Sequence, residues 1–200
     1  MKVAKYTETL DRILKEGNGF ITSSAALRAA VPKDSFYRYV KNHDLERHSR
    51  GIYSLKDAFP DEFVLLQTRF PKAVFSHDTA LFLHNMSERE PIPLSVSVSS
   101  GYNSSSLKDQ GVHIYYVKPE WHDMGICDVM TPEGNLVKAY DKERTICDLI
   151  RKRTDFDVTE FNYAMKSYVS SGDKNLARLS EYARTMNMET RVWNIIGVLL

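Results

Sequence analysis

The 200-residue chain has few of the residues that mark several protein classes. Its only cysteines, Cys127 and Cys147, form no C-x-x-C pair, so we expect free thiols and neither a disulfide framework nor a cysteine-based zinc site. No cleavable signal sequence opens the chain, and no apolar run approaches the roughly 18 residues that a membrane-spanning helix needs. We therefore expect a soluble, cytoplasmic protein.

Glycine-rich phosphate-binding loops are also missing. Gly101 and Gly111 fit neither G-x-G-x-x-G nor G-x-x-x-x-G-K, and no G-x-S-x-G nucleophile motif occurs. Neither cysteine has a recognisable general base nearby in the sequence. These absences predict that the chain is not an enzyme and needs no cofactor.

Two weaker patterns could hold a metal. His77 and His84 lie about 10 Å apart along one predicted helix at about 1.5 Å per residue, which is too far to share one ion, so packing or capping is the expected role. Asp155 and Asp157 form a D-x-D, but they follow a basic run and precede a helix, which favours helix capping by Asp157. No metal site is predicted.

The chain does contain an asymmetric distribution of charge. Residues 1–57 hold eleven Lys and Arg against seven Asp and Glu, a net charge of +4, while the remainder carries 16 against 19, or −3. This division favours an anionic partner for the N-terminal part. We place a domain boundary there, giving a first domain of residues 1–57 and a second of residues 58–200.

The first domain reads as three helices and a hairpin. Apolar residues at helical spacing between Tyr6 and Leu14 predict the first helix, Thr22 or Ser23 can cap a second, and Pro32 suits the first turn of a third. Two short strands, 45–49 and 52–55, follow around Arg50-Gly51. This order is the pattern of a winged helix-turn-helix.

The cations of this domain gather on the third helix and the hairpin, which are the elements that dock on DNA in such folds. The third helix would enter the major groove, the hairpin would contact phosphates or the minor groove, and the start of the second helix would anchor a phosphate. Docking of another protein is the alternative role for this domain. The predicted DNA-binding residues are Thr22, Ser23, Ser35, Tyr37, Arg38, Lys41, Arg47, His48 and Arg50.

The second domain reads as a small sheet with helices, and a helical tail follows. Strands are expected at 94–99, 112–117, 126–130 and 136–140, with a short apolar run at 73–75 and the polar stretch SSGYNSSSLKDQG as an irregular connector. Asp141 can cap the first tail helix. The overall expectation is an α+β fold, with a winged helix-turn-helix followed by a mixed α/β domain.

Three stretches of the chain resemble the antitoxin of the bacterial abortive-infection AbiE system, a type IV toxin-antitoxin family. They are GFITSSAALRAAVPKDSFYRYVKNHDLERHSRGIYSL, FSHDTALFLHNMSEREP and YDKERTICDLIRKR, in that order. The resemblance implies a repressor that binds double-stranded DNA at inverted repeats in the promoter of its own gene. It also implies an antitoxin that counters a nucleotidyltransferase toxin without a stable complex. Arg144, Thr145 and Asp148 match the third stretch, where capping and salt bridging are the expected roles.

Two questions stay open at this stage. A single winged helix with about five cationic contacts binds DNA weakly, so a dimer or a cooperative pair on a repeated site is expected. The apolar stretch 192–200 could couple the copies, although core packing is the stronger reading. The alternative function is an enzyme that modifies the toxin or nucleic acid, with the winged helix as a targeting module, which would need Asp155, Asp157 or His77.

Overall fold

The computed structural model describes residues 4–49, 51–58 and 61–200. The fold is α+β, as predicted, and the chain forms two compact units. The first unit contains residues 1–69 together with 130–137, and the second contains residues 70–129 and 138–200. This division differs from the predicted boundary after Asp57, because residues 61–69 and the segment 130–137 group with the N-terminal unit.

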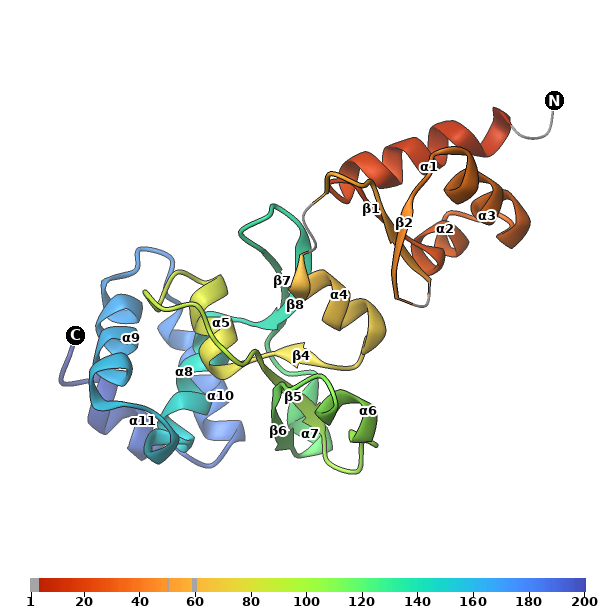
Figure 1. The fold of residues 1–200 in the computed structure, drawn as a ribbon. Coiled ribbons are helices and arrows are strands. Elements are labelled where there is room, and N and C mark those ends of the chain that lie inside the picture. The colour runs from red at the N-terminus through yellow and green to blue at the C-terminus, as the bar shows by residue number, and fades with distance from the viewer. Residues whose placement is uncertain (1–3, 50, 59–60) are drawn as a thin grey trace. The chain divides into compact units, whose positions relative to one another are not determined.

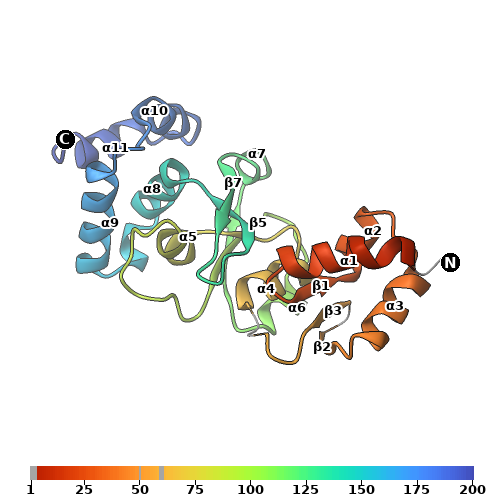
Figure 2. The same ribbon diagram turned by 90° about the horizontal axis from the view of Figure 1, so that it is seen from above.

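The first unit combines four helices with a three-stranded antiparallel sheet in the order β1-β3-β2 (Figures 1 and 2). Its elements are α1 (Ala4–Glu16), β1 (Phe20–Thr22), α2 (Ser23–Arg28), α3 (Lys33–Asn42), β2 (Glu46–Ser49), β3 (Ile52–Ser54) and α4 (Glu62–Arg69). Leu10, Phe36 and Tyr53, each from a different element, are buried in its core. The three predicted helices and the hairpin are present, and β1 is a strand that the sequence analysis did not anticipate.

The second unit is built on a five-stranded mixed sheet in the order β6-β5-β4-β8-β7, although the last residue of β7 and the first two of β8 are grouped with the first unit. Its strands are β4 (Val74–Phe75), β5 (Ser95–Ser99), β6 (His113–Val117), β7 (Ile126–Met130) and β8 (Leu136–Tyr140). The pairs β4-β8 and β5-β6 are parallel, and β4-β5 is antiparallel. Four of these strands, β5 to β8, were predicted, with ends that differ by at most one residue, whereas β4 was recognised only as a short apolar run.

The helices of the second unit are α5 (His77–Leu83), α6 (Ser105–Lys108), α7 (Pro119–His122), α8 (Lys142–Arg151), α9 (Val158–Ser170), α10 (Leu176–Thr185) and α11 (Glu189–Ile196), with a 3-10 turn at Arg153–Asp155. The helix α8 is buried along most of its length and packs against α5, α9, α10 and α11. In Figures 1 and 2 the helices α9, α10 and α11 lie on one side of this unit, with α5 and α8 between them and the sheet. The predicted irregular connector is wrong in one detail, since it contains α6.

Helix caps in this unit follow the sequence. Asp141 accepts a hydrogen bond from the backbone N of Arg144 at 2.8 Å, and Asp157 accepts one from the backbone N of Thr159 at 2.7 Å, as expected for N-cap aspartates. Trp121 on α7 is buried against α8, where the Arg151 guanidinium lies 4.5 Å from its ring centre. These contacts fix the start of α8 and one of its faces.

Candidate nucleic-acid interface

Helix α3 is amphipathic because its buried aromatic residues and its charged residues lie on different faces. It begins directly after Pro32, whose extended backbone ends the preceding turn. Phe36 and Tyr39 face the core and are 2% and 4% exposed. Arg38 and Lys41 lie on the exposed face. Within the part of the chain that the structure describes, neither of these two side chains forms an ion pair or a hydrogen bond.

The orientation of α3 is fixed from beneath by α1. The Tyr39 hydroxyl donates a hydrogen bond to Asp11 Oδ1 on α1 at 2.5 Å, and the His43 ring stacks on Tyr39 with 3.9 Å between ring centres. Burial and then the hydrogen bond to Asp11 raise the pKa of Tyr39, so its hydroxyl stays protonated as the donor. The exposed face of α3 is therefore held at a defined angle to α1.

Ser35 and Tyr37 were predicted as supporting donors on α3. Ser35 is half-buried, whereas Tyr37 is 49% exposed. The Tyr37 ring makes edge contacts with Phe36 at 5.4 Å and with Tyr53 of β3 at 6.3 Å. Tyr37 thus joins α3 to the hairpin while part of its ring remains accessible.

One exposed cation of α3 is absent from the predicted set. Lys33 is exposed at the first position of the helix, and it too has no ion pair among the residues described. It shares a face with Tyr37 and Lys41 at i, i+4 and i+8. That spacing was the signal in the sequence that could have identified it.

The predicted phosphate anchor at the start of α2 has other partners in the structure. The Thr22 hydroxyl accepts a hydrogen bond from the backbone N of Ala25 and contacts Ser24 Oγ, both at 3.0 Å, so it serves as the helix cap. The backbone N of Ser23 donates to the carbonyl of Gly51 at 2.8 Å. These bonds tie α2 to the turn of the hairpin.

Gly51 is required in that turn for two reasons. Its φ of +79° lies in the left-handed region, and a Cβ at this position would come within 2.5 Å of Ser23 Oγ. Its predicted neighbour in the interface, Arg50, lies outside the described residues.

The predicted hairpin residues Arg47 and His48 are both exposed, and they occupy different positions in the strand register. Arg47 is exposed on β2, opposite Tyr53 of β3. The register then shifts between Arg47 and Ser49, which leaves His48 in a bulge. His48 Nε2 lies 2.6 Å from Ser54 Oγ, and its ring packs at 5.3 Å from that of Phe20. His48 therefore takes part in the packing of the sheet.

The histidines considered as metal ligands have separate surroundings. His77 is 2% exposed, with its ring stacked on Tyr115 at 3.4 Å between ring centres, and His84 Nε2 lies 2.7 Å from the carbonyl oxygen of Tyr140. Asp155 lies 3.8 Å from Lys152. Across the described residues, no three His, Cys, Asp or Glu side chains are arranged to hold a metal ion.

The residues of the third resembling stretch form a buried polar cluster on α8. Arg144 is fully buried, and its Nε donates to Asp148 Oδ2 at 3.1 Å. Its Nη1 donates to the carbonyl oxygens of Trp121 and Met124. Thr145 Oγ1 donates to the carbonyl of Tyr140 at 3.4 Å. The predicted salt bridge between Arg144 and Asp148 is thus present, and it lies in the core.

The C-terminal apolar stretch is divided between core and surface. Val192 and Ile196 of α11 are fully buried in the core of the second unit. Val198 and Leu200 are 83% and 59% exposed. No helix in the described ranges is long and apolar enough to span a membrane.

Comparisons with known proteins show a fold and no family. No protein-family model matches the chain, and no curated protein does. Among solved structures, it is similar to the crystal structure of the RV2827C protein from Mycobacterium tuberculosis, with a TM-score of 0.58 and 12% sequence identity. That similarity covers 98% of this chain and 75% of that one, and it concerns the fold alone.

Proposed function

We propose that the N-terminal unit is a winged helix-turn-helix that binds double-stranded DNA through α3 and the β2-β3 hairpin. The observation that carries this proposal is the exposed face of α3, where Lys33, Arg38 and Lys41 have no partner among the described residues. Unpaired cations on the exposed face of a helix that packs on two others can bind DNA phosphates and donate hydrogen bonds to base edges. Arg47 supplies a further exposed cation on the adjoining hairpin.

The strength of such an interface sets the form of the DNA site. A few cationic contacts give weak, salt-dependent binding at physiological ionic strength. Two copies on an inverted repeat would raise the affinity, with half-sites separated by a multiple of about 10 bp so that both copies meet the same side of the duplex. We therefore propose a repeated operator in the promoter of the protein's own gene.

The resemblance to the AbiE antitoxins supports the wider role. We propose that the protein represses its own promoter and counters a nucleotidyltransferase toxin without a stable complex. The second unit, which contains two of the three resembling stretches, would carry the antitoxin activity. The Arg144–Asp148 pair would act there by holding α8 in place.

DNA binding is tested with the full-length protein and DNA from upstream of its own gene, by fluorescence anisotropy across a salt series. Arg38→Ala and Lys41→Ala are each expected to weaken specific binding by about 1–3 kcal/mol. Lys15→Ala is the matched control, because it removes an exposed cation of α1 that lies outside the proposed interface. Circular dichroism checks that all three variants are folded.

The outcomes separate the two roles of the first unit. Steep salt dependence, and a sharp loss of affinity when one repeat is scrambled, would support a repressor on paired half-sites. Binding no tighter than to random DNA, or variants that bind like the wild type, would contradict the assignment and favour protein docking. In cells that express the toxin, Arg38→Ala is expected to lose repression and keep protection.

A further inference from the structure

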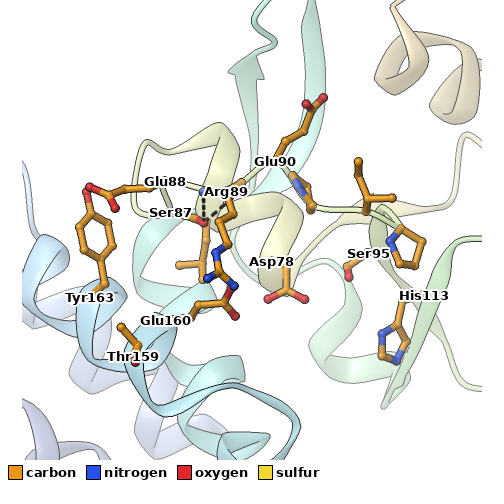
Figure 3. A pocket seen from close by; sticks show the side chains of 14 residues that line it. Asp78, Ser87, Glu88, Arg89, Glu90, Ser95, His113, Thr159, Glu160 and Tyr163 are labelled. Atoms are coloured by element: carbon orange, nitrogen blue, oxygen red, sulfur yellow. Dashed lines mark hydrogen bonds and ion pairs between the residues drawn. The ribbon is translucent and has the colours of Figure 1, made fainter.

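The second unit contains a cavity that the proposed DNA interface does not use. It has a volume of about 400 Å³ and is bordered by α5, the segment 87–93, the start of α9 and the edge of β5 and β6 (Figure 3). Its charged lining is mostly acidic: Asp78, Glu88, Glu90 and Glu160 stand against Arg89, with His113 at one end. The charge of the lining favours a cation over an anion.

Of the carboxylates here that form no ion pair among the described residues, Asp78 is half-buried, whereas Glu88 and Glu90 are exposed. Asp78 lies in the first turn of α5. Burial, followed by the neighbouring Glu160, raises the pKa of Asp78. A carboxylate removed from water without a cation gains from a ligand that supplies one.

Ser95 provides an independent sign of a missing ligand group. The residue is 1% exposed, and its Oγ has no hydrogen-bond partner among the described residues. Its backbone is already satisfied, since its N donates to Thr79 Oγ1 at 2.7 Å and its carbonyl accepts from the N of Ser76 at 3.1 Å. Figure 3 shows the Ser95 side chain between Asp78 and His113 in the lining of the cavity. The buried hydroxyl therefore has unused hydrogen-bonding capacity beside the cavity.

The mouth of the cavity already holds one cation. Arg89 Nη1 lies 2.9 Å from Glu160 Oε1, and the Arg89 side chain is 79% exposed. An exposed ion pair of this kind is weak and easily exchanged. Arg89 therefore competes with a ligand for Glu160 and leaves Asp78 unpaired.

Apart from Ser87 and Thr159, the remaining lining is mostly apolar. Leu81, Pro91 and Ile92 contribute aliphatic surface, and the ring of Tyr163 adds an aromatic one. Ile92 is 87% exposed and Tyr163 is 40% exposed, so both stand near the opening. Such walls favour an organic cation with an alkyl stem over a bare metal ion. The described His, Cys, Asp and Glu side chains are also not arranged to hold a metal ion.

We propose that this cavity binds a primary ammonium group carried on an alkyl stem. The Asp78 carboxylate forms an ion pair with the ammonium group and accepts one N–H, and Ser95 Oγ accepts a second N–H. The alkyl stem lies along Leu81, Ile92 and Tyr163. An ammonium group has three N–H donors and no acceptor, which suits a carboxylate beside an unpartnered hydroxyl. The ligand is either a free aliphatic diamine or a lysine side chain of another protein, and the proposal is independent of DNA binding.

The test is isothermal titration of the full-length protein at low salt with two probes, 1,5-diaminopentane and an N-acetylated, C-amidated Gly-Lys-Gly peptide. Saturable binding of either probe at one site is expected, and the probe that binds identifies the source of the ammonium. 1-Pentanol, which has the stem without the charge, is expected not to bind. Sodium chloride at the same ionic strength is titrated as the blank. If neither amine gives more heat than this blank, the proposal is wrong.

Variants of opposite effect sharpen the test. Asp78→Asn is expected to weaken binding by at least about tenfold, because a charge-assisted hydrogen bond is lost. Arg89→Gln is expected to strengthen it several-fold by releasing Glu160. Asp109→Asn is the matched control, an exposed aspartate on the same unit that lies outside the cavity lining.

Ser95→Ala and Glu160→Gln keep the test decisive if Asp78→Asn does not fold. Each is expected to weaken binding of the amine by several-fold while thermal unfolding remains cooperative. DNA binding is expected to be unchanged in all these variants. Asp78→Asn with wild-type affinity, or Ser95→Ala and Glu160→Gln both with wild-type affinity, would overturn the assignment.

Discussion

At the scale of single residues, the buried carboxylate of Asp61 joins two distant parts of the first unit. The residue is 1% exposed, and its carboxylate accepts four hydrogen bonds. The donors are the backbone N of Phe63 at 2.9 Å, the backbone N of Val64 at 3.1 Å, Thr131 Oγ1 at 2.6 Å and Asn135 Nδ2 at 2.9 Å. One side chain thus caps α4 and holds the turn between β7 and β8.

Asp61→Ala is expected to lower the free energy of unfolding by about 3 kcal/mol or more, because it removes a helix cap and leaves two buried side chains without an acceptor. Urea unfolding followed by circular dichroism measures the loss. Asp57→Ala, an exposed aspartate a few residues earlier, is the control and is expected to change the stability by less than about 0.5 kcal/mol. A similar effect of both substitutions would show that the four bonds contribute little.

His77 gives a prediction about pH. Burial, followed by the nearby charges of Arg144, His113 and Lys152, lowers the pKa of His77 well below its usual range. Below about pH 6.5 the unfolded chain therefore binds a proton that the folded chain does not, and the free energy of unfolding falls with the pH. The positive φ of 51° at this residue suits asparagine, which does not titrate.

His77→Asn is accordingly expected to be less stable than the wild type at neutral pH, because the ring stack with Tyr115 is lost. It is also expected to lose less additional stability between about pH 7.5 and about pH 5.5 than the wild type does. Denaturant unfolding at the two pH values gives both quantities. An equal pH dependence in the two proteins would rule out His77 as its source.

The residue-scale predictions from the sequence succeed where the interaction is local. The caps formed by Asp141 and Asp157 depend on a backbone N–H two or three residues away, so the sequence shows both partners. Asp61 could not be recognised in this way, because Thr131 and Asn135 lie 70 and 74 residues further along. Ser95 is identified only by the absence of a partner in three dimensions.

At the scale of secondary-structure elements, α8 is organised around the buried Arg144–Asp148 pair. Nη1 of Arg144 has two backbone acceptors, whereas its Nη2 has no partner among the described residues. Burial raises the pKa of Asp148, and the Arg144 charge opposes that rise. The pair therefore stabilises α8 only while both partners are present.

Asp148→Ala is expected to cost about 3–5 kcal/mol, because it leaves a buried guanidinium without its carboxylate. Replacing both residues with apolar ones, Arg144→Met with Asp148→Leu, is expected to cost less than the single change. Denaturant unfolding of the two single variants and the double variant completes the cycle. A double variant less stable than either single variant would show that the hydrogen bonds of Arg144 to the backbone dominate.

The elements that the sequence predicts well are those long enough for the spacing of their apolar residues to show a helical or strand period. The ends of β7 and β8 are correct because their apolar residues flank a Pro132–Gly134 turn. The strand β1 was missed because it has three residues, and its pairing with β3 joins positions about thirty residues apart. The four-residue helices α6 and α7 are too short for a helical period to appear.

At the scale of the whole molecule, the first unit is assembled from two separate parts of the chain. Besides the bonds to Asp61, Asn18 Nδ2 donates to the carbonyl of Glu133 at 2.5 Å, so the turn 131–135 also contacts the turn that follows α1. Composition indicated a boundary after Asp57, because charge changes there. A segment that returns from residue 130 leaves no trace in composition.

A fragment of residues 1–69 lacks that returning segment. Asp61→Ala is expected to cost less in this fragment than in the full chain, by about 1–3 kcal/mol, since only the bonds to α4 remain to be lost. Pulse proteolysis in urea measures both differences. Equal costs in fragment and full chain would mean that Thr131 and Asn135 do not stabilise the unit.

Trp121, the ring that Arg151 covers, has a practical consequence. The other tryptophan of the chain is Trp193 on α11, so both lie in the second unit, and the first unit contains tyrosine but no tryptophan. Indole emission therefore follows the unfolding of the second unit, and a cation close to the buried Trp121 ring makes its signal sensitive to the loss of native packing. Fluorescence excited selectively in tryptophan reports the thermal unfolding of the second unit, while circular dichroism reports both units. Comparing the two signals can thus separate the melting of the units without an added dye.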